Sequence, residues 1–379
     1  MTTRYTFLDV YRGLIVLLMI EGHVVRELLS PALQQSPVFS LHEFVHGITG
    51  AGFLFGAGIT FGISVQRRWP EFLSVTPTLL RRLRRIALLI LTGYALHLPY
   101  LSLRKTLEES NPQEWALFLS FDVLQCIGFS LLAVQILMIV LRQERWFVAA
   151  LFVLVPSAFL ISPVVWNVAP NLILPEGVWM ALHGKSGSVY PLLPYSAFLF
   201  AGGLASYEFM KFAGLGRERV FVKRLATGGV VLILLGIGLE LSPVIVYEAR
   251  DFWDTGPTFM LMKLGGLFLF MSVSWLLENR LHSSPRWIAL IGTESLFVYV
   301  LHLLLLYGSV VNADIHLSAI WKNSLEWGPA LGVSAVFTLL LYALARFWSG
   351  LKRGHPVLLR SLVWWMVVVF GFEFFIRPY

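Results

Sequence analysis

A line of charged side chains runs through the first apolar segment of the chain, which is long enough to span a bilayer. Arg12 and His23 lie eleven residues apart in it, and Asp9 precedes them. On a helix, eleven steps of about 100° make about three turns, so these side chains fall close to one line over about 16 Å. An ionisable side chain at the bilayer centre costs on the order of 2.5 to 3.5 kcal/mol on insertion scales. We therefore expect this face to line a polar interior and to form a functional site.

The rest of the composition fits a polytopic helical membrane protein. The 379 residues are 57% hydrophobic and only 13% charged, and the mean hydropathy is +0.74. These values exclude a soluble globular domain. The one cysteine, Cys126, lies in an apolar stretch, so no internal disulfide or thiol metal cluster is expected.

Apolar runs predict an all-α fold with about eleven transmembrane helices (10–12), in a single transmembrane domain over residues 1–379. The expected spans are residues 10–29, 45–65, 84–101, 116–140, 146–163, 191–209, 224–244, 258–278, 287–308, 327–346 and 356–375. Basic residues gather in alternate loops, as in the cluster from Arg81 to Arg85, which predicts a cytoplasmic N-terminus. The basic loops on one side of the membrane thus account for the net charge of +7, and we expect no nucleic-acid partner. The expected location is the cytoplasmic (inner) membrane, as a multi-pass protein in contact with the lipid bilayer.

Three histidines near the start of the chain are candidates for acid–base chemistry. His23 stands beside Glu21 at the outer end of the first span, where it is placed to accept a proton from a hydroxyl or an amine. The alternative is a histidine that only packs against neighbouring helices, and the aligned Arg12 makes the two readings about equal. His42 and His46 follow at positions i and i+4, a spacing that places both on one helix face. That spacing also fits one side of a zinc site, but no clear third ligand lies nearby in the sequence, so no metal is expected.

A later polar cluster carries Glu294, Ser295 and His302 along the ninth expected span. Ser295 and His302 lie about 10 Å apart along a helix axis. A nucleophile and its base must hydrogen-bond directly, so this separation argues against a serine hydrolase.

An arginine cluster precedes the third expected span, with Arg67 and Arg68 in the same loop. Its guanidinium groups are suited to the phosphates of a cytoplasmic nucleotide cofactor, although the positive-inside rule alone also predicts such a cluster. The members are Arg81, Arg82, Arg84 and Arg85. No GxxxxGK[ST] motif occurs, so the sequence gives no support for ATP-driven work.

Four short motifs, taken in order, resemble those of the transmembrane acyltransferases. These include the heparan-α-glucosaminide N-acetyltransferase group, its bacterial relatives and the more distant O-acyltransferases of bacterial surface polysaccharides. The motifs are Leu8-Asp9-Val10-Tyr11-Arg12-Gly13, Phe53-Leu54-Phe55-Gly56-Ala57-Gly58, Tyr190-Pro191-Leu192-Leu193-Pro194-Tyr195 with Gly202, and Ile291-Gly292-Thr293-Glu294-Ser295-Leu296 through His302. The resemblance covers nearly the whole chain.

The resemblance implies transfer of an acyl group, usually acetyl, from acetyl-CoA to a sugar or glycan on the far side of the membrane. His23 matches a functional histidine of the polysaccharide enzymes, a position where the heparan-type enzymes carry Asn. His42 is the best match for the catalytic histidine of the heparan group, and the longer loop here also permits an alignment with His46. The acidic residue that the heparan group carries near the start of the second span is replaced by small residues, Gly50, Ala51 and Gly52. Whether His23 or His42 is the base therefore stays open.

From the residues and the resemblance together we expect the following site. The catalytic residues are His23, His42, Asp9 and Arg12; the donor contacts are Arg12, Arg81, Arg82, Arg84 and Arg85; and the acceptor contacts are His46, Glu294 and His302. The main alternative is a transporter or flippase without acyl-transfer chemistry, which also needs polar groups at the membrane midplane, and a non-catalytic scaffold is a third. The identity of the acceptor, O- versus N-acylation, direct transfer versus an acyl-enzyme, and assembly as a monomer or a homodimer are left open.

Overall fold

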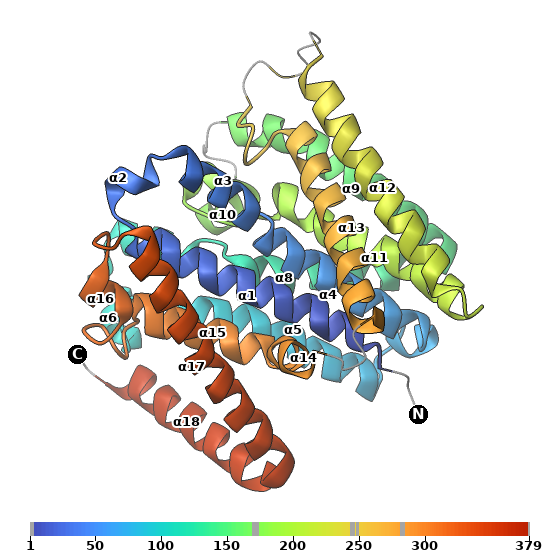
Figure 1. Cartoon of the computed structure of the whole chain (residues 1–379). Helices are drawn as coiled ribbons and strands as arrows, with labels where there is room; N and C mark the ends of the chain where they lie inside the picture. Colours follow the sequence, from blue (N-terminus) through green and yellow to red (C-terminus); the bar gives the residue numbers. More distant parts are fainter. Residues whose placement is uncertain (1–3, 169–173, 243–246, 248–249, 281–284, 378–379) are drawn as a thin grey trace. The chain divides into compact units, whose positions relative to one another are not determined.

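The computed structural model describes residues 4–168, 174–242, 247, 250–280 and 285–377. Their regular structure is helical throughout, apart from an isolated bridge between Leu29 and Leu325 (Figure 1). The all-α, polytopic membrane fold expected from the sequence is thereby confirmed. The backbone contacts divide the chain into two compact units, and the single domain over residues 1–379 stays a prediction.

The first unit comprises residues Met1–Thr49, Leu96–Phe118 and Leu277–Tyr379. At its centre lies α1 (Thr6–Leu28), which packs against α3, α14, α15, α16 and α17. The other helices of this unit are α2 (Pro31–Gln34), α3 (Pro37–His46), α6 (Leu103–Glu109), α7 (Pro112–Leu119), α14 (Arg286–Thr293), α15 (Ser295–Tyr307), α16 (Leu317–Trp321), α17 (Trp327–Gly354) and α18 (Pro356–Ile376).

The second unit comprises residues Gly50–Ala95 and Leu119–Leu276. Its core is α11, which packs against α8, α9 and α12. Its elements are α4 (Thr49–Gln66), the 3₁₀ turn η1 (Trp69–Phe72), α5 (Pro77–Leu96), α8 (Val123–Leu141), α9 (Glu144–Asn167), α10 (Glu176–Leu182), the 3₁₀ turn η2 (Gly184–Ser186), α11 (Leu192–Ala213), α12 (Glu218–Glu240) and α13 (Pro257–Arg280).

Glycines set the closest helix crossings in both units. In the first, a Cβ at Gly13 of α1 would lie 2.1 Å from the Ile288 carbonyl oxygen, and one at Gly292 of α14 would lie 1.8 Å from the Asp9 carbonyl oxygen. In the second, Gly58 of α4 and Gly202 of α11 make the same kind of contact, at 2.0 and 2.1 Å from opposing carbonyl oxygens. Small residues let helix backbones touch in a membrane. Each of the four belongs to one of the short motifs quoted above, and these motifs are therefore packing devices as well as candidate chemistry.

Among the described residues, seven helical stretches are long and apolar enough to cross a membrane, or eight if α14 and α15, bent by 78°, form one broken span. The stretches are Pro37–Gln66, Val123–Leu141, Glu144–Asn167, Glu218–Glu240, Pro257–Asn279, Trp327–Gly354 and Pro356–Ile376. The charged α1, the arginine-rich α5 and α11 lie outside this set. The count of about eleven spans and the cytoplasmic N-terminus stay predictions.

Candidate functional site

The N-terminal end of the charged stripe is a small ionic cluster built around Asp9. This side chain is 9% exposed, and its carboxylate accepts a hydrogen bond of 2.8 Å from Arg4 Nε. Arg12 NH1 lies 3.6 Å from the other carboxylate oxygen. Arg4 also donates to Thr293 Oγ1 at 2.9 Å, which links α1 to the end of α14. The predicted proximity of Asp9 and Arg12 is present, and Arg4 is a partner that the sequence reasoning did not include.

The other end of the stripe is a pair of histidines. His23 Nδ1 and His302 Nε2 lie 3.0 Å apart, and the two rings are tilted by 35° with centroids 5.2 Å apart. His302 on α15 is 0% exposed. Aromatic rings surround the pair, with Tyr307 against His23 and Tyr299 against His302. A hydrogen bond between imidazoles needs one donor and one acceptor, so at least one of the two rings is neutral.

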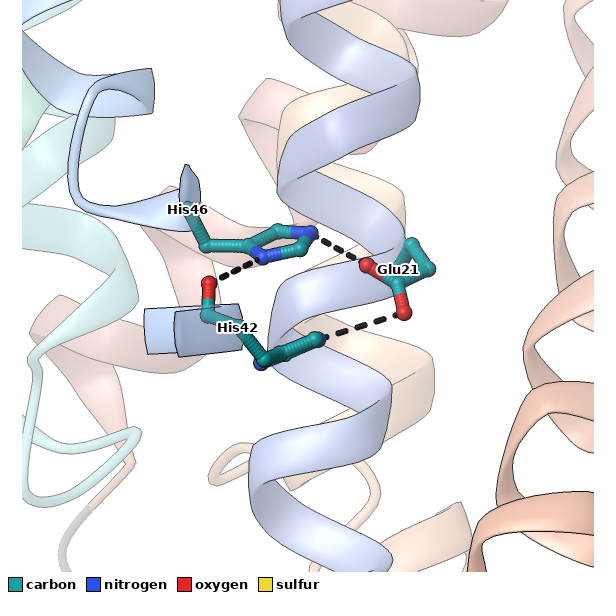
Figure 2. Close-up of side chains that lie close together, drawn as sticks. All are labelled: Glu21, His42 and His46. Carbon is teal, nitrogen blue, oxygen red and sulfur yellow. Dashed lines mark hydrogen bonds and ion pairs between the residues drawn. The ribbon is translucent and has the colours of Figure 1, made fainter. Parts of the chain in front are cut away.

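A second histidine cluster joins α3 to α1 through Glu21 (Figure 2). His42 Nε2 lies 3.2 Å from Glu21 Oε1, and His46 Nε2 contacts Glu21 Oε2. The rings of His42 and His46 stack with centroids 3.9 Å apart and 26° between their planes. His42 Nδ1 lies 3.7 Å from Glu43 Oε1, so both nitrogens of this ring face carboxylates. That setting stabilises the cationic form of His42.

Glu294 lies at the break between α14 and α15, where it pairs with Lys352. Its side chain is 4% exposed, and Lys352 Nζ of α17 lies 2.5 Å from its Oε2. Of the three residues expected to contact the acceptor, the structure therefore joins His302 to His23, His46 to Glu21, and Glu294 to a lysine. Glu21 was named in the sequence only as a neighbour of His23, and its contact with His42 across 21 residues depends on how α3 packs against α1.

In the second unit, the arginine cluster lines a cavity of about 310 Å³. Arg82 is fixed in its wall by hydrogen bonds to Ser64 Oγ at 2.7 Å and Gln135 Oε1 at 3.3 Å, and its guanidinium lies 3.7 Å from the ring centroid of Phe72. Burial lowers the pKa of Arg82 to about 10, and the positive charge of Arg85 adds to this shift. An anion in the cavity would relieve that repulsion. The lining residues are Ser64, Arg68, Phe72, Thr78, Arg81, Arg82 and Arg85.

Three of the five arginines expected to bind the donor thus share the cavity, and Arg84 is outside its lining. Arg68 joins them because η1 turns the chain back between α4 and α5. Among the described residues, no carboxylate belongs to the lining, and Glu71 Oε2 accepts a hydrogen bond of 2.6 Å from the lining hydroxyl of Thr78. Arg12 belongs to the first unit, where it contacts Asp9.

The sequence was compared with those of known proteins. Residues 4–245 match the model of a family described as heparan-alpha-glucosaminide N-acetyltransferase, catalytic. The matched stretch is more than half of the chain and contains His23, His42, His46 and the arginine cavity, while Glu294 and His302 follow it. A search of the curated proteins found no match.

Proposed function

Because the chain belongs to the heparan-α-glucosaminide N-acetyltransferase catalytic family, we propose that it is a membrane enzyme that transfers acetyl from acetyl-CoA to a sugar. The acceptor group is a hydroxyl or an amine of an extracytoplasmic sugar or glycan, and the donor binds from the cytoplasm. The enzyme resides in the inner membrane.

The observation that carries the proposal is the hydrogen bond between His23 and His302. A histidine can act as a general base only when its ring is neutral, because the imidazolium form has no lone pair to accept a proton. The His23–His302 contact keeps at least one ring neutral, whereas His42 lies between the carboxylates of Glu21 and Glu43. We therefore assign the base to His23 and a positioning role to His302.

The reaction follows from these roles. His23 accepts the proton of the acceptor hydroxyl or amine as the acceptor oxygen or nitrogen attacks the thioester carbonyl carbon. The tetrahedral intermediate then collapses and its carbon–sulfur bond breaks. CoA leaves as a thiolate, which takes the proton from the His23 imidazolium. His302 holds the ring in place through the 3.0 Å contact. Asp9 and Arg12 organise the polar face along which the donor arm approaches.

The arginine cavity supports a binding site for the nucleotide end of the donor. Coenzyme A carries a pyrophosphate and a further phosphate on its ribose, and guanidinium groups bind such oxygens with paired, charge-assisted hydrogen bonds. Arg68, Arg81 and Arg85 supply the charge, and Arg82 is part of the wall. Thr78 Oγ1, which accepts a hydrogen bond from Arg81 NH2 at 3.3 Å, holds that side chain beside the cavity.

The test is the transfer of label from acetyl-labelled acetyl-CoA to a panel of amino sugars and glycans by detergent-purified protein. We expect CoA release and labelled product from the native chain, loss of both in His23→Ala, and residual transfer in His42→Ala. Loss in His42→Ala with retention in His23→Ala would move the base to His42. Transport of either substrate without CoA release would support the transporter alternative.

A further inference from the structure

The cluster of Glu21, His42 and His46 lies apart from the His23–His302 pair although both involve α1. Glu21 and His23 are two residues apart, and two steps of about 100° put their side chains on nearly opposite faces of a helix. One face meets α15 and the other meets α3. The role proposed for His23 therefore leaves the Glu21 cluster unexplained.

The hydrogen bonds of His46 show that a positive centre is needed at this cluster. His46 Nδ1 lies 2.7 Å from the His42 carbonyl oxygen, and a carbonyl only accepts, so Nδ1 carries a hydrogen and donates it. In a neutral ring Nε2 then presents a lone pair, yet this atom contacts the Glu21 carboxylate (Figure 2). Either a proton or a metal cation must lie between the two groups.

The ligand atoms converge as those of a metal site do. One ring nitrogen of each histidine and an oxygen of Glu21 all lie within 4.8 Å of one another. Tetrahedral Zn²⁺ binds nitrogen and oxygen ligands at about 2.0–2.2 Å, which separates neighbouring ligands by about 3.4 Å, close to the 3.2 Å between His42 Nε2 and Glu21 Oε1.

The groups behind the ligands have the pattern that supports metal-bound histidines. Such histidines use their other ring nitrogen to donate to a carbonyl or a carboxylate, which fixes the ring orientation. His46 Nδ1 donates to the His42 carbonyl, and Glu43 faces His42 Nδ1 at 3.7 Å while it is itself bound by Arg26. A Cβ at Gly22 would lie 2.5 Å from the His46 ring, so this glycine lets the ring lie against α1.

We propose that Glu21, His42 and His46 form a Zn²⁺ site, with water as the fourth ligand. Two histidines and one glutamate are a zinc ligand set that keeps one position open. The three side chains are 29%, 10% and 12% exposed, so the site is in reach of water and of the ion. Residues 42–46 read His-Glu-Phe-Val-His, an HExxH pattern typical of zinc sites. The expectation of no metal missed this pattern, and the third ligand lies 21 residues before His42, on another helix.

The site would fasten α3 to α1. None of the ten residues of α3 is buried, and its Val38 and Leu41 are 61% and 65% exposed. Phe39 packs against the buried cluster of Val25, Leu29 and Ala330. A metal that bridges Glu21 to two side chains of α3 adds a second attachment.

The experiment is a titration of ZnCl₂ into detergent-purified full-length protein that has been stripped with EDTA and dialysed, followed by calorimetry. We expect one Zn²⁺ per chain and a higher Tm. His46→Ala and Glu21→Gln should each weaken binding by at least about 100-fold, because even outer partners of a ligand change affinity by about 10–100-fold. His355→Ala, an exposed histidine at the start of α18, is the matched control and should bind as the native chain does.

A spectrum guards against variants that fail to fold. Co²⁺ added to the stripped native chain should give visible d–d absorption of tetrahedral intensity that ZnCl₂ removes. Three results would overturn the proposal. They are no saturable Zn²⁺ binding by the native chain, binding by His46→Ala or Glu21→Gln as tight as by the native chain, and a loss of binding in His355→Ala as large as in those two variants. None of these measurements uses acetyl transfer, so they can fail or succeed independently of the proposed function.

Discussion

The crossing of α1 and α14 leaves no room for a methyl group, and Gly292→Ala tests how closely the fold is tied to the site. The added Cβ would lie 1.8 Å from the Asp9 carbonyl oxygen and 2.7 Å from Gly13 N. Real Cβ atoms essentially never come closer than 3.0 Å to such atoms. The backbones must therefore separate by about 1.2 Å at this point, because both contacts are to main-chain atoms that no rotamer change can move.

Two magnitudes follow from that displacement. Forcing a group into a packed interior costs about 1–3 kcal/mol, so the variant should unfold at a Tm several degrees lower. The same shift moves the segment that leads into His302, and a misplacement of about 1 Å lowers a reaction rate by about 10²-fold. We expect a comparable fall in acetyl transfer, because the 3.0 Å contact between His23 and His302 does not survive a movement of this size.

The assay is thermal unfolding and acetyl transfer of Gly292→Ala beside Gly332→Ala. Gly332 lies on α17 in the same unit, and a Cβ there meets nothing within 4 Å. Replacing a helical glycine with alanine stabilises by up to about 1 kcal/mol, so this control should unfold at the native Tm or slightly above it. Native Tm and native transfer in Gly292→Ala would refute the packing argument.

Three further predictions concern single side chains. Arg85→Ala should raise the KM for acetyl-CoA by about 10-fold or more, because a hydrogen bond to a charged group contributes about 1.5–3 kcal/mol. Steady-state kinetics check this beside Arg145→Ala, which removes an exposed arginine outside the cavity. An equal rise in KM in both variants would contradict the prediction. Lys352→Ala leaves the buried Glu294 carboxylate without its ion pair and should destabilise by about 1–3 kcal/mol; Glu294→Gln in the same chain should restore the Tm, and a double variant no more stable than Lys352→Ala would show that the pair is not the cause. His302→Asn should lower kcat by about 10²-fold or more with little change in KM, since it acts on the base and not on binding; a change in KM alone would assign it to the acceptor site.

Much of the fold could be predicted from the sequence because hydrophobic length is a local property. Each expected span overlaps a helix or the bent pair α14 and α15, although the bounds shift by several residues at α5 and α8. The glycines of α1 and α14 were quoted as motif residues, but their contact joins positions 13 and 292, and no local pattern reveals which glycine faces which.

The candidate site was predicted residue by residue and not as pairs. His23 and His302 were both named from their chemistry, and their contact across 279 residues depends on how α15 packs against α1. Glu21 was left out for a related reason. Its role appears only when α3 folds back against α1, and the sequence between them gives no periodicity that fixes this geometry. Arg68 likewise joins the arginine cavity through the turn at η1.

The most direct test of the account is transfer across a membrane. Proteoliposomes that hold an amino sugar inside would receive labelled acetyl-CoA outside, and the acetylated sugar would be measured after the vesicles are washed. The account predicts labelled product inside, in amounts that match CoA released outside, from the native chain and not from His23→Ala. Labelled product that forms only when both substrates are on the same side, or equal product from His23→Ala, would contradict it.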